Sequence, residues 1–286
     1  MGDIAPFVTE RTRLEVGERL LDPKVKALLD AGRRLLVESV ESGIENPFRF
    51  PSAEIVCHEA AGHPPFGPNR VSAHEDEILR FAARSSIPID SPALRSADDA
   101  FTQTWPHLER YRADLAMYAL SMPSRLAGEE IAKRALSRMT TQAVDSVLER
   151  LASEDLKLFE DSLFRVQLVM QAMAPTEPEI REAVDRMYTN IDRTWVAVYQ
   201  GILDHYNVTL RPDVTVLDIT HMLTGAAEGA GLRLLVQRDN KAIADAVRHR
   251  SVLGKTALCV FAASICPRGD TRTLGTFFRD TIRANS

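Results

Sequence analysis

The sequence predicts an all-α protein, and two observations support that prediction. In the second half of the chain, apolar side chains recur three and four residues apart, which is the spacing of one helix face. No stretch alternates apolar and polar residues for long enough to predict a sheet. The 286 residues are 45% hydrophobic and 26% charged, which is typical of a globular protein with a sizeable core.

The first helix is predicted from Lys24 to Glu41. Asp22 and Pro23 form a good helix start, because aspartate caps free N–H groups and proline suits the first turn. Turn-forming residues then interrupt the chain in three places, at 43–51, 62–68 and 85–92. The first half of the chain is therefore expected to be less regular than the second.

The longest helix is predicted from Ile180 to about Asn207. Thr176 stands three residues before Glu179, which is the spacing of a capping box, and Pro178 falls in the first turn. Apolar residues then follow at helical spacing: Val184, Met187, Ile191, Trp195, Val198, Ile202 and Tyr206.

Further helices are expected on both sides of this long one. One or two span 140–173, and three more span 214–236, 251–265 and 271–283. The helix over 214–236 contains a cluster of small residues, Gly225, Ala226, Gly229 and Ala230. A glycine inside a helix costs about 1 kcal/mol relative to alanine. We therefore expect the cluster to allow close approach of another helix.

Cysteine content, hydropathy and charge indicate the compartment of the protein and the kinds of partner to expect. The chain has three cysteines, Cys57, Cys259 and Cys266. Because a disulfide framework uses more cysteines and an even number of them, this set indicates a reducing cytoplasm. The longest apolar run, Thr256–Cys266, is about half of the ~20 residues that span a membrane, so no membrane partner is expected. Residues 1–100 contain 12 basic and 17 acidic side chains, so the N-terminal third is not a basic nucleic-acid arm.

His58, Glu59 and His63 form the most conspicuous cluster of metal-ligating types. Zinc hydrolases of the common helical type place two histidines four residues apart, with a glutamate between them as general base. Here the histidines are five apart, so polar, solvated histidines at a helix end are the simpler interpretation. A metal-dependent hydrolase stays an alternative, and no glycine-rich phosphate loop or other motif predicts a cofactor or a bound metal.

Methionine and aromatic side chains with a few polar tips fall at core-facing positions of the predicted helices. They either fill the core or line an apolar ligand cavity between helices, and the sequence leaves both interpretations open. The candidate pocket residues are Trp105, Met117, Tyr118, Met170, Met173, Met187, Tyr188, Trp195 and His221.

From Phe159 onward the predicted elements follow one another in a recognisable order. Met173–Arg181 is a turn into the long helix, Leu210–Asp213 follows that helix, and next come a helix with Thr224-Gly225 and a final apolar helix. In this order residues 155–286 resemble the regulatory domain of TetR-family transcriptional regulators. The resemblance implies a homodimer in which the helices over 214–236 and 251–265 pair with a second copy as a four-helix bundle. The implied interface residues are Leu223, Gly225, Ala226, Gly229, Ala230, Leu258 and Phe261.

The N-terminal part resembles the DNA-binding domain of the same family. Leu28–Glu38 is similar to its first helix, Ala61-Gly62 to its turn, and His74–Leu79 to the start of its fourth helix. The resemblance implies three parts. They are an N-terminal extension over 1–22, a degenerate helix-turn-helix-like domain over 23–86, and a helical regulatory and dimerisation domain over 87–286.

DNA contacts are expected from His63, Asn69 and Arg70, which fall in the segment that resembles the recognition helix. A proline inside a helix costs about 3 kcal/mol or more, and this segment contains Pro64, Pro65 and Pro68. These prolines favour an alternative in which specific DNA binding is lost. A second string resembling a helix-turn-helix, over 128–144, offers different reading residues: Arg138, Thr140, Thr141 and Gln142.

The function expected is that of a ligand-responsive TetR-like regulator of the DNA-binding repressor type. It would be a homodimer that binds a small apolar molecule in the C-terminal helices, and it would not be an enzyme. One alternative is a TetR-like ligand-binding or interaction protein without specific DNA binding. The other is a metal-dependent hydrolase that uses His58, Glu59 and His63.

Overall fold

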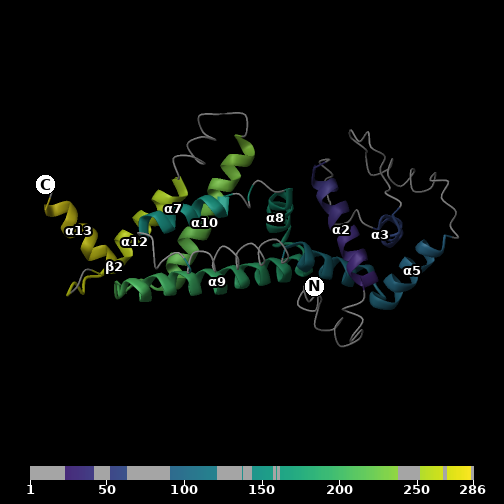
Figure 1. Cartoon of the computed structure of the whole chain (residues 1–286), viewed down its shortest axis with the longest axis horizontal. Coiled ribbons are helices and arrows are strands. Elements are labelled where there is room, and N and C mark those ends of the chain that lie inside the picture. Colours follow the sequence, from purple (N-terminus) through teal and green to yellow (C-terminus); the bar gives the residue numbers. More distant parts are fainter. Residues whose placement is uncertain are drawn as a thin grey trace. The chain divides into compact units, whose positions relative to one another are not determined.

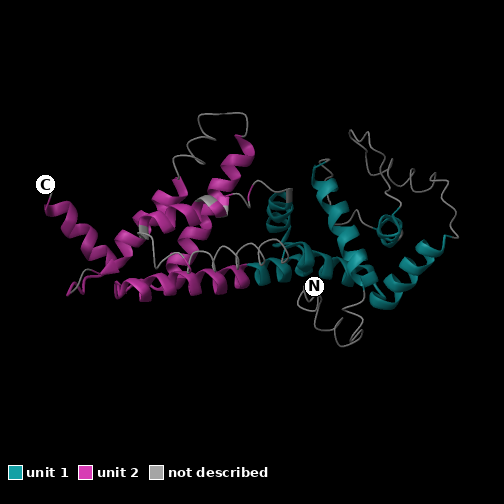
Figure 2. Cartoon of the chain, viewed as in Figure 1, with its two compact units in different colours: residues 1–122, 162–187 teal, residues 123–161, 188–286 magenta. Residues whose placement is uncertain are grey.

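The computed structural model describes residues 23–41, 52–62, 91–120, 137, 144–156, 159, 162–237, 252–266 and 269–284. Within these ranges the chain is almost entirely helical, which confirms the all-α prediction. No helix in the described ranges is long and apolar enough to cross a membrane. The chain divides into two compact units, coloured separately in Figure 2: residues 1–122 with 162–187 form unit 1, and residues 123–161 with 188–286 form unit 2.

Unit 1 is a cluster of helices around α2. Its elements are α2 (Pro23–Glu41), α3 (Ala53–Ala60), α5 (Pro92–Thr104), a helical stretch over 108–120, α8 (Ser162–Met173) and the first ten residues of α9 (Pro178–Tyr206) (Figure 1). α2 packs against α3, α5 and α8, and its leucines at 28, 29 and 35 belong to the core. The predicted first helix is thus confirmed.

Serine caps start the two short helices of unit 1. The Ser52 hydroxyl accepts a hydrogen bond from the Ile55 N–H at the start of α3, and the Ser91 hydroxyl does the same for the Leu94 N–H of α5. Each cap satisfies one of the N–H groups that a helix leaves without an internal partner. Pro92 adds a preformed first turn to α5.

Gly32 allows a buried contact between α2 and the helical stretch over 108–120. The Tyr111 hydroxyl donates a 2.9 Å hydrogen bond to the Leu28 carbonyl, which lies one helical turn before Gly32. A Cβ atom on Gly32 would lie 1.9 Å from this hydroxyl oxygen, whereas the next nearest atoms, the methyl carbons of Leu115, would be 3.0 and 3.1 Å away. Glycine is therefore required here because it leaves room for one oxygen atom.

Unit 2 surrounds a second core with helices from distant parts of the chain. It contains α7 (Val144–Leu156), the last nineteen residues of α9, α10 (Val216–Val236), α12 (Val252–Ser264) and α13 (Leu274–Ala284). α12 packs against α7 and α10. β1 (Thr209–Leu210) pairs antiparallel with β2 (Ile265–Cys266), a two-residue contact that the sequence analysis did not anticipate.

The helix boundaries of unit 2 agree with the sequence, but one cap does not. α9, α10, α12 and α13 are confirmed within a few residues of their predicted ends. Thr176 was expected to cap α9; instead, its hydroxyl donates to the Met173 carbonyl at the end of α8. The capping box of unit 2 lies at α10, where the Thr215 side chain and Asp218 exchange hydrogen bonds with each other's backbone N–H.

Close helix approach in unit 2 occurs at Gly231, and not at the two glycines that suggested it. A Cβ on Gly231 would meet the Phe159 ring at 2.6 Å, whereas a Cβ on Gly225 or Gly229 would have no neighbour within 4 Å. Of these three glycines, therefore, only Gly231 is required by packing within the described part of the protomer. Gly225 and Gly229 lie on the exposed side of α10.

The Gly32 contact predicts a strong coupling between two substitutions. Gly32→Ala should destabilise the protein by about 2–4 kcal/mol, because the new methyl group overlaps the buried Tyr111 hydroxyl. Tyr111→Phe removes that oxygen, so the double variant should be more stable than Gly32→Ala alone, with a coupling of about 1–3 kcal/mol. Urea unfolding of the four proteins measures the cycle. Strict additivity of the two effects would contradict the proposed contact.

Candidate functional site

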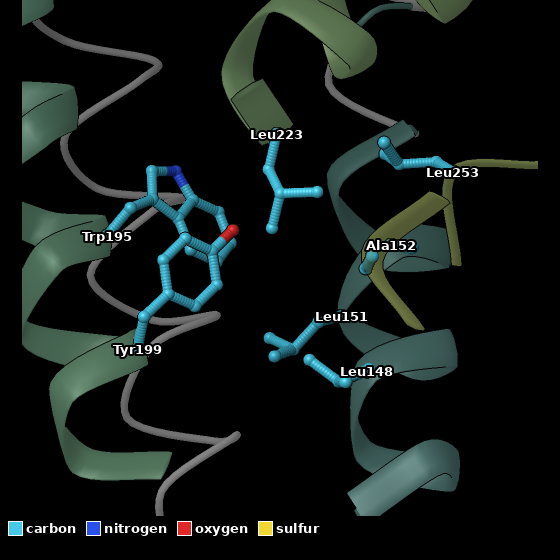
Figure 3. Close-up of a pocket in the computed structure, with 8 residues that line it drawn as sticks. Leu148, Leu151, Ala152, Trp195, Tyr199, Leu223 and Leu253 are labelled. Carbon is cyan, nitrogen blue, oxygen red and sulfur yellow. The ribbon is translucent and has the colours of Figure 1, made fainter. Parts of the chain in front are cut away.

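An apolar pocket lies inside unit 2 between four helices. Figure 3 shows Trp195 and Tyr199 of α9 on one side and Leu148, Leu151 and Ala152 of α7 on the other. Leu223 of α10 and Leu253 and Ala257 of α12 complete the lining. The pocket thus brings together side chains from positions between 148 and 257, which local sequence patterns do not connect.

The two aromatic rings give this pocket a flat wall. Trp195 and Tyr199 stack with ring centroids 5.5 Å apart and an interplanar angle of 24°, and Tyr199 meets the edge of Phe261 at 5.5 Å. One helical turn separates Trp195 from Tyr199, so α9 alone fixes their stacking. A planar apolar molecule is the kind of ligand that such a wall favours.

The pocket is small in this structure. Its volume is about 30 Å³, whereas pockets for drug-sized ligands measure about 300–1,000 Å³. A ligand would therefore have to select a more open arrangement of the four helices. Ala152 and Ala257 present little bulk, and the larger aliphatic side chains between them and the rings set the present volume.

A second surface of unit 2 lies on the exposed sides of α10 and α12. Exposed residues on these helices recur four and three residues apart, the 3.5-residue period by which paired helices meet. We call these residues the seam: Met222, Gly225, Gly229, Leu232 and Val236 on α10, with Val252, Lys255, Cys259 and Ala262 on α12. All except Lys255 are apolar, small or cysteine.

The seam exposes large apolar side chains to solvent. Met222, Leu232, Val236 and Val252 are 44%, 46%, 73% and 45% exposed. Single exposed apolar residues are common on protein surfaces, whereas contiguous apolar patches often belong to interaction surfaces. The opposite sides of the same helices are buried, with Leu223, Ala230 and Leu253 in the core.

The predicted interface residues divide between the seam and the core. Gly225 and Gly229 belong to the seam. Leu223, Ala230 and Phe261 are at most 8% exposed, and Ala226 and Leu258 pack partly buried against the core clusters of unit 2. The first three are core residues of the protomer, and the other two are only partly accessible.

The nine predicted pocket residues are distributed over both units. Trp195 is the only one of the nine that lines the pocket described above. Trp105, Met117, Tyr118, Met170 and Met187 are buried and belong to unit 1, as does the half-buried Met173. In unit 2, the Tyr188 hydroxyl donates to Glu228 at 2.9 Å. The side chain of His221 is 57% exposed, with its Nε2 3.2 Å from Asp192.

Buried aromatic residues of unit 1 form a packed cluster without a cavity role in this structure. Trp105, Tyr111 and Phe101 lie with ring centroids 4.8–5.5 Å apart. The indole N–H of Trp105 donates to Asp114 at 2.8 Å, and the Tyr118 hydroxyl donates to Asp30 at 2.6 Å. Burial raises the pKa of the Tyr111 phenol well above its ordinary value. Their polar groups are thus used in fixing the core.

The possible hydrolase residues are only partly described. His58 and Glu59 lie on α3, and Glu59 accepts a 2.8 Å hydrogen bond from the Arg34 guanidinium, while His63 lies outside the described residues. In the described ranges, no three His, Cys, Asp or Glu side chains are grouped as a metal site would require. Burial raises the pKa of the Cys57 thiol to about 12, so this cysteine stays protonated and is a poor nucleophile.

The candidate DNA-contacting residues also lie outside the described residues. This applies both to the segment that resembles a recognition helix and to the alternative string: His63, Asn69 and Arg70, and Arg138, Thr140, Thr141 and Gln142. The DNA contacts stay predictions.

Comparisons with known proteins leave the family open. No protein-family model, no curated protein and no solved structure matches this chain.

Enlarging the pocket should reveal its preference for apolar ligands. Leu151→Ala should destabilise the protein by about 2–4 kcal/mol. The added space should strengthen binding of a planar apolar probe such as 1-aminonaphthalene. In a Trp105→Phe background, Trp195 is the only tryptophan, so quenching of its fluorescence reports pocket occupancy.

Leu156→Ala provides the matched control. Leu156 is equally buried on α7 but does not line the pocket. It should cost similar stability without improving the Trp195 response. Equal responses from the two variants would show that the probe binds elsewhere.

Proposed function

We propose that this chain is a homodimeric, ligand-responsive transcriptional regulator of the TetR type. The observation that supports it most directly is the seam, because two consecutive helices repeat exposed apolar and small residues at the spacing of paired helices. Pairing of α10 and α12 with the same helices of a second copy would make a four-helix bundle. A two-fold arrangement of this kind presents the same surface on both copies.

Small residues favour this pairing over a simple apolar patch. Gly225, Gly229 and Ala262 interrupt the row of larger side chains and let a partner helix approach closely. Glycine inside an exposed helix is unfavourable by about 1 kcal/mol. Because a Cβ on Gly225 or Gly229 would meet no described residue within 4 Å, contact with a second copy would supply a physical reason for both.

The beginning of unit 1 is compatible with a helix-turn-helix. α2 and α3 pack together and are joined by the ion pair between Arg34 and Glu59. α3 ends at Ala61-Gly62, where Gly62 has φ +81°, a conformation that favours glycine. The sequence places the family's Ala-Gly turn at these two residues. We assign DNA contact to the segment that follows this turn.

The pocket provides the regulatory input. Its lining includes Leu223 of α10 and Leu253 and Ala257 of α12, so the helices that form one pocket wall also present the seam on their outer sides. A ligand that binds an open pocket more tightly than a closed one shifts the population toward open protomers. That shift moves α10 or α12, and with it the geometry of the dimer.

A charge placed in the seam should separate the two copies. Leu232→Glu removes one exposed leucine from each copy and introduces an unpaired carboxylate, so the dimer Kd should rise about 100-fold or more. Folding should be unaffected because the Leu232 side chain is 46% exposed in the protomer. Sedimentation equilibrium measures the Kd.

Ala197→Arg is a matched control, since Ala197 is an exposed helical residue of unit 2 on α9 and outside the seam. This variant should dimerise like the wild type. A wild-type protein that stays monomeric at millimolar concentration would contradict the homodimer.

DNA selection tests the regulator function itself. Wild-type protein incubated with a random double-stranded library should enrich a palindromic sequence, because a two-fold dimer reads two half-sites. The Leu232→Glu variant should enrich none, since a monomer holds a single half-site weakly. If the dimeric wild type also enriches nothing, the alternative without specific DNA binding replaces the regulator.

A further inference from the structure

The last described helix, α13, presents an apolar side that its own protomer leaves uncovered. No residue of α13 is buried, and Phe278 and Ile282 are 62% and 52% exposed. Leu274, Phe278 and Ile282 are four residues apart, so they share one side of the helix, while Arg279 and Arg283 lie toward the other. An isolated helix of eleven residues is only marginally stable in water, so contacts must hold α13.

Contacts with preceding residues anchor α13, among them a 3.1 Å hydrogen bond from the Arg272 guanidinium to Asp280. The buried Arg211 guanidinium lies 3.9 Å from the centre of the Phe277 ring and donates to the Ala263 and Arg272 carbonyls. Asp213 accepts from the Leu274 N–H at 2.9 Å, capping the first turn. The first turn of α13 is therefore anchored to the rest of unit 2.

The rest of α13 extends away from α10, whose seam residues are exposed. In Figure 1 it runs from the end of α12 toward the C-terminus, on the side of unit 2 opposite to α10. All the large hydrophobic side chains exposed in the described ranges belong to α10, α12 and α13: Leu217, Met222, Leu232, Val236, Val252, Phe278 and Ile282. One protomer thus carries an uncovered seam and an uncovered arm on the same unit.

We propose that α13 is an arm that packs on unit 2 of the second copy through Leu274, Phe278 and Ile282, next to the seam. This inference rests on the homodimer proposed above and adds a second contact to it. The size of the surface supports it. Nine residues of α10 and four of α12 are exposed, fewer than the ~20–30 residues that each side of a standard interface uses. Phe278 and Ile282 of α13 would add two large apolar side chains to this surface.

Two-fold symmetry explains why the second copy is the occupant. Each copy offers the same arm and the same uncovered surface, so a single arrangement covers both arms at once. The Arg211 anchor supports this role, because a fixed base loses little conformational freedom when the arm binds.

Sedimentation equilibrium of three variants tests the arm separately from the seam. Phe278→Ser combined with Ile282→Ser should raise the dimer Kd about tenfold or more. Arg283→Gln, a change on the other side of α13, should leave the Kd near that of the wild type. Leu232→Glu reports on the seam. If Leu232→Glu dissociates the dimer and the serine pair does not weaken it, the arm proposal fails and the homodimer stands; if the wild type is a monomer, both fail.

Cross-linking identifies what the arm touches. Phe278→Cys in a Cys259→Ser, Cys266→Ser background carries one benzophenone group, since the remaining Cys57 is buried with a raised thiol pKa. After mixing of ¹⁵N-labelled and unlabelled protein, irradiation should join a peptide of α13 in one isotope to a peptide of unit 2 in the other. Cross-links confined to one copy would overturn the proposal. So would binding of the arm to anionic phospholipid vesicles with no effect of the serine pair on the dimer Kd.

Discussion

The helices α10 and α12 are apolar on two opposite sides, and this constraint governs unit 2. Their inner sides fill the core and line the pocket, with Leu223, Leu253 and Ala257 contributing. Their outer sides expose the seam, and α10 also exposes Asp218, His221 and Arg233. Apolar side chains exposed on a helix gain stability when a second surface covers them. The proposed homodimer would supply that surface.

Arg211 organises the part of unit 2 where distant segments meet. Its backbone N–H donates to the Ser264 carbonyl beside the β1–β2 pair, and its side chain reaches Ala263, Asp270 and Arg272. The hydrogen bonds from Arg272 keep the pKa of Asp270 below its ordinary value. Burying a guanidinium costs much free energy unless its N–H groups have hydrogen-bond partners. Here that requirement ties the end of α12 to the start of α13.

The sequence predicted helices well and helix faces less well. Periodicity placed α9, α10 and α12 within a few residues, because a long amphipathic repeat has one structural solution. On α10, apolar residues repeat at nearly the same interval on two sides. The resemblance implied Leu223 and Ala230 as interface residues, but the structure buries both in the protomer, and it exposes Leu232 and Val236, which were not named. Their spacing from Gly225 and Gly229 was the available signal.

The pocket could not be predicted, because tertiary packing alone brings Leu148 near Trp195.

Under the proposed function, the small volume of the pocket is informative about regulation. A cavity of about 30 Å³ admits no drug-sized ligand, so binding must select protomers in which α10 or α12 has moved away from α7 or α9. A ligand shifts an equilibrium only by the difference between its affinities for the two states. A closed pocket makes that difference large, because the closed state offers almost no binding at all. The same helices carry the seam, so opening the pocket also changes the surface that a second copy contacts. Ligand binding and dimer geometry are then coupled because both involve α10 and α12, and no other element has to connect them.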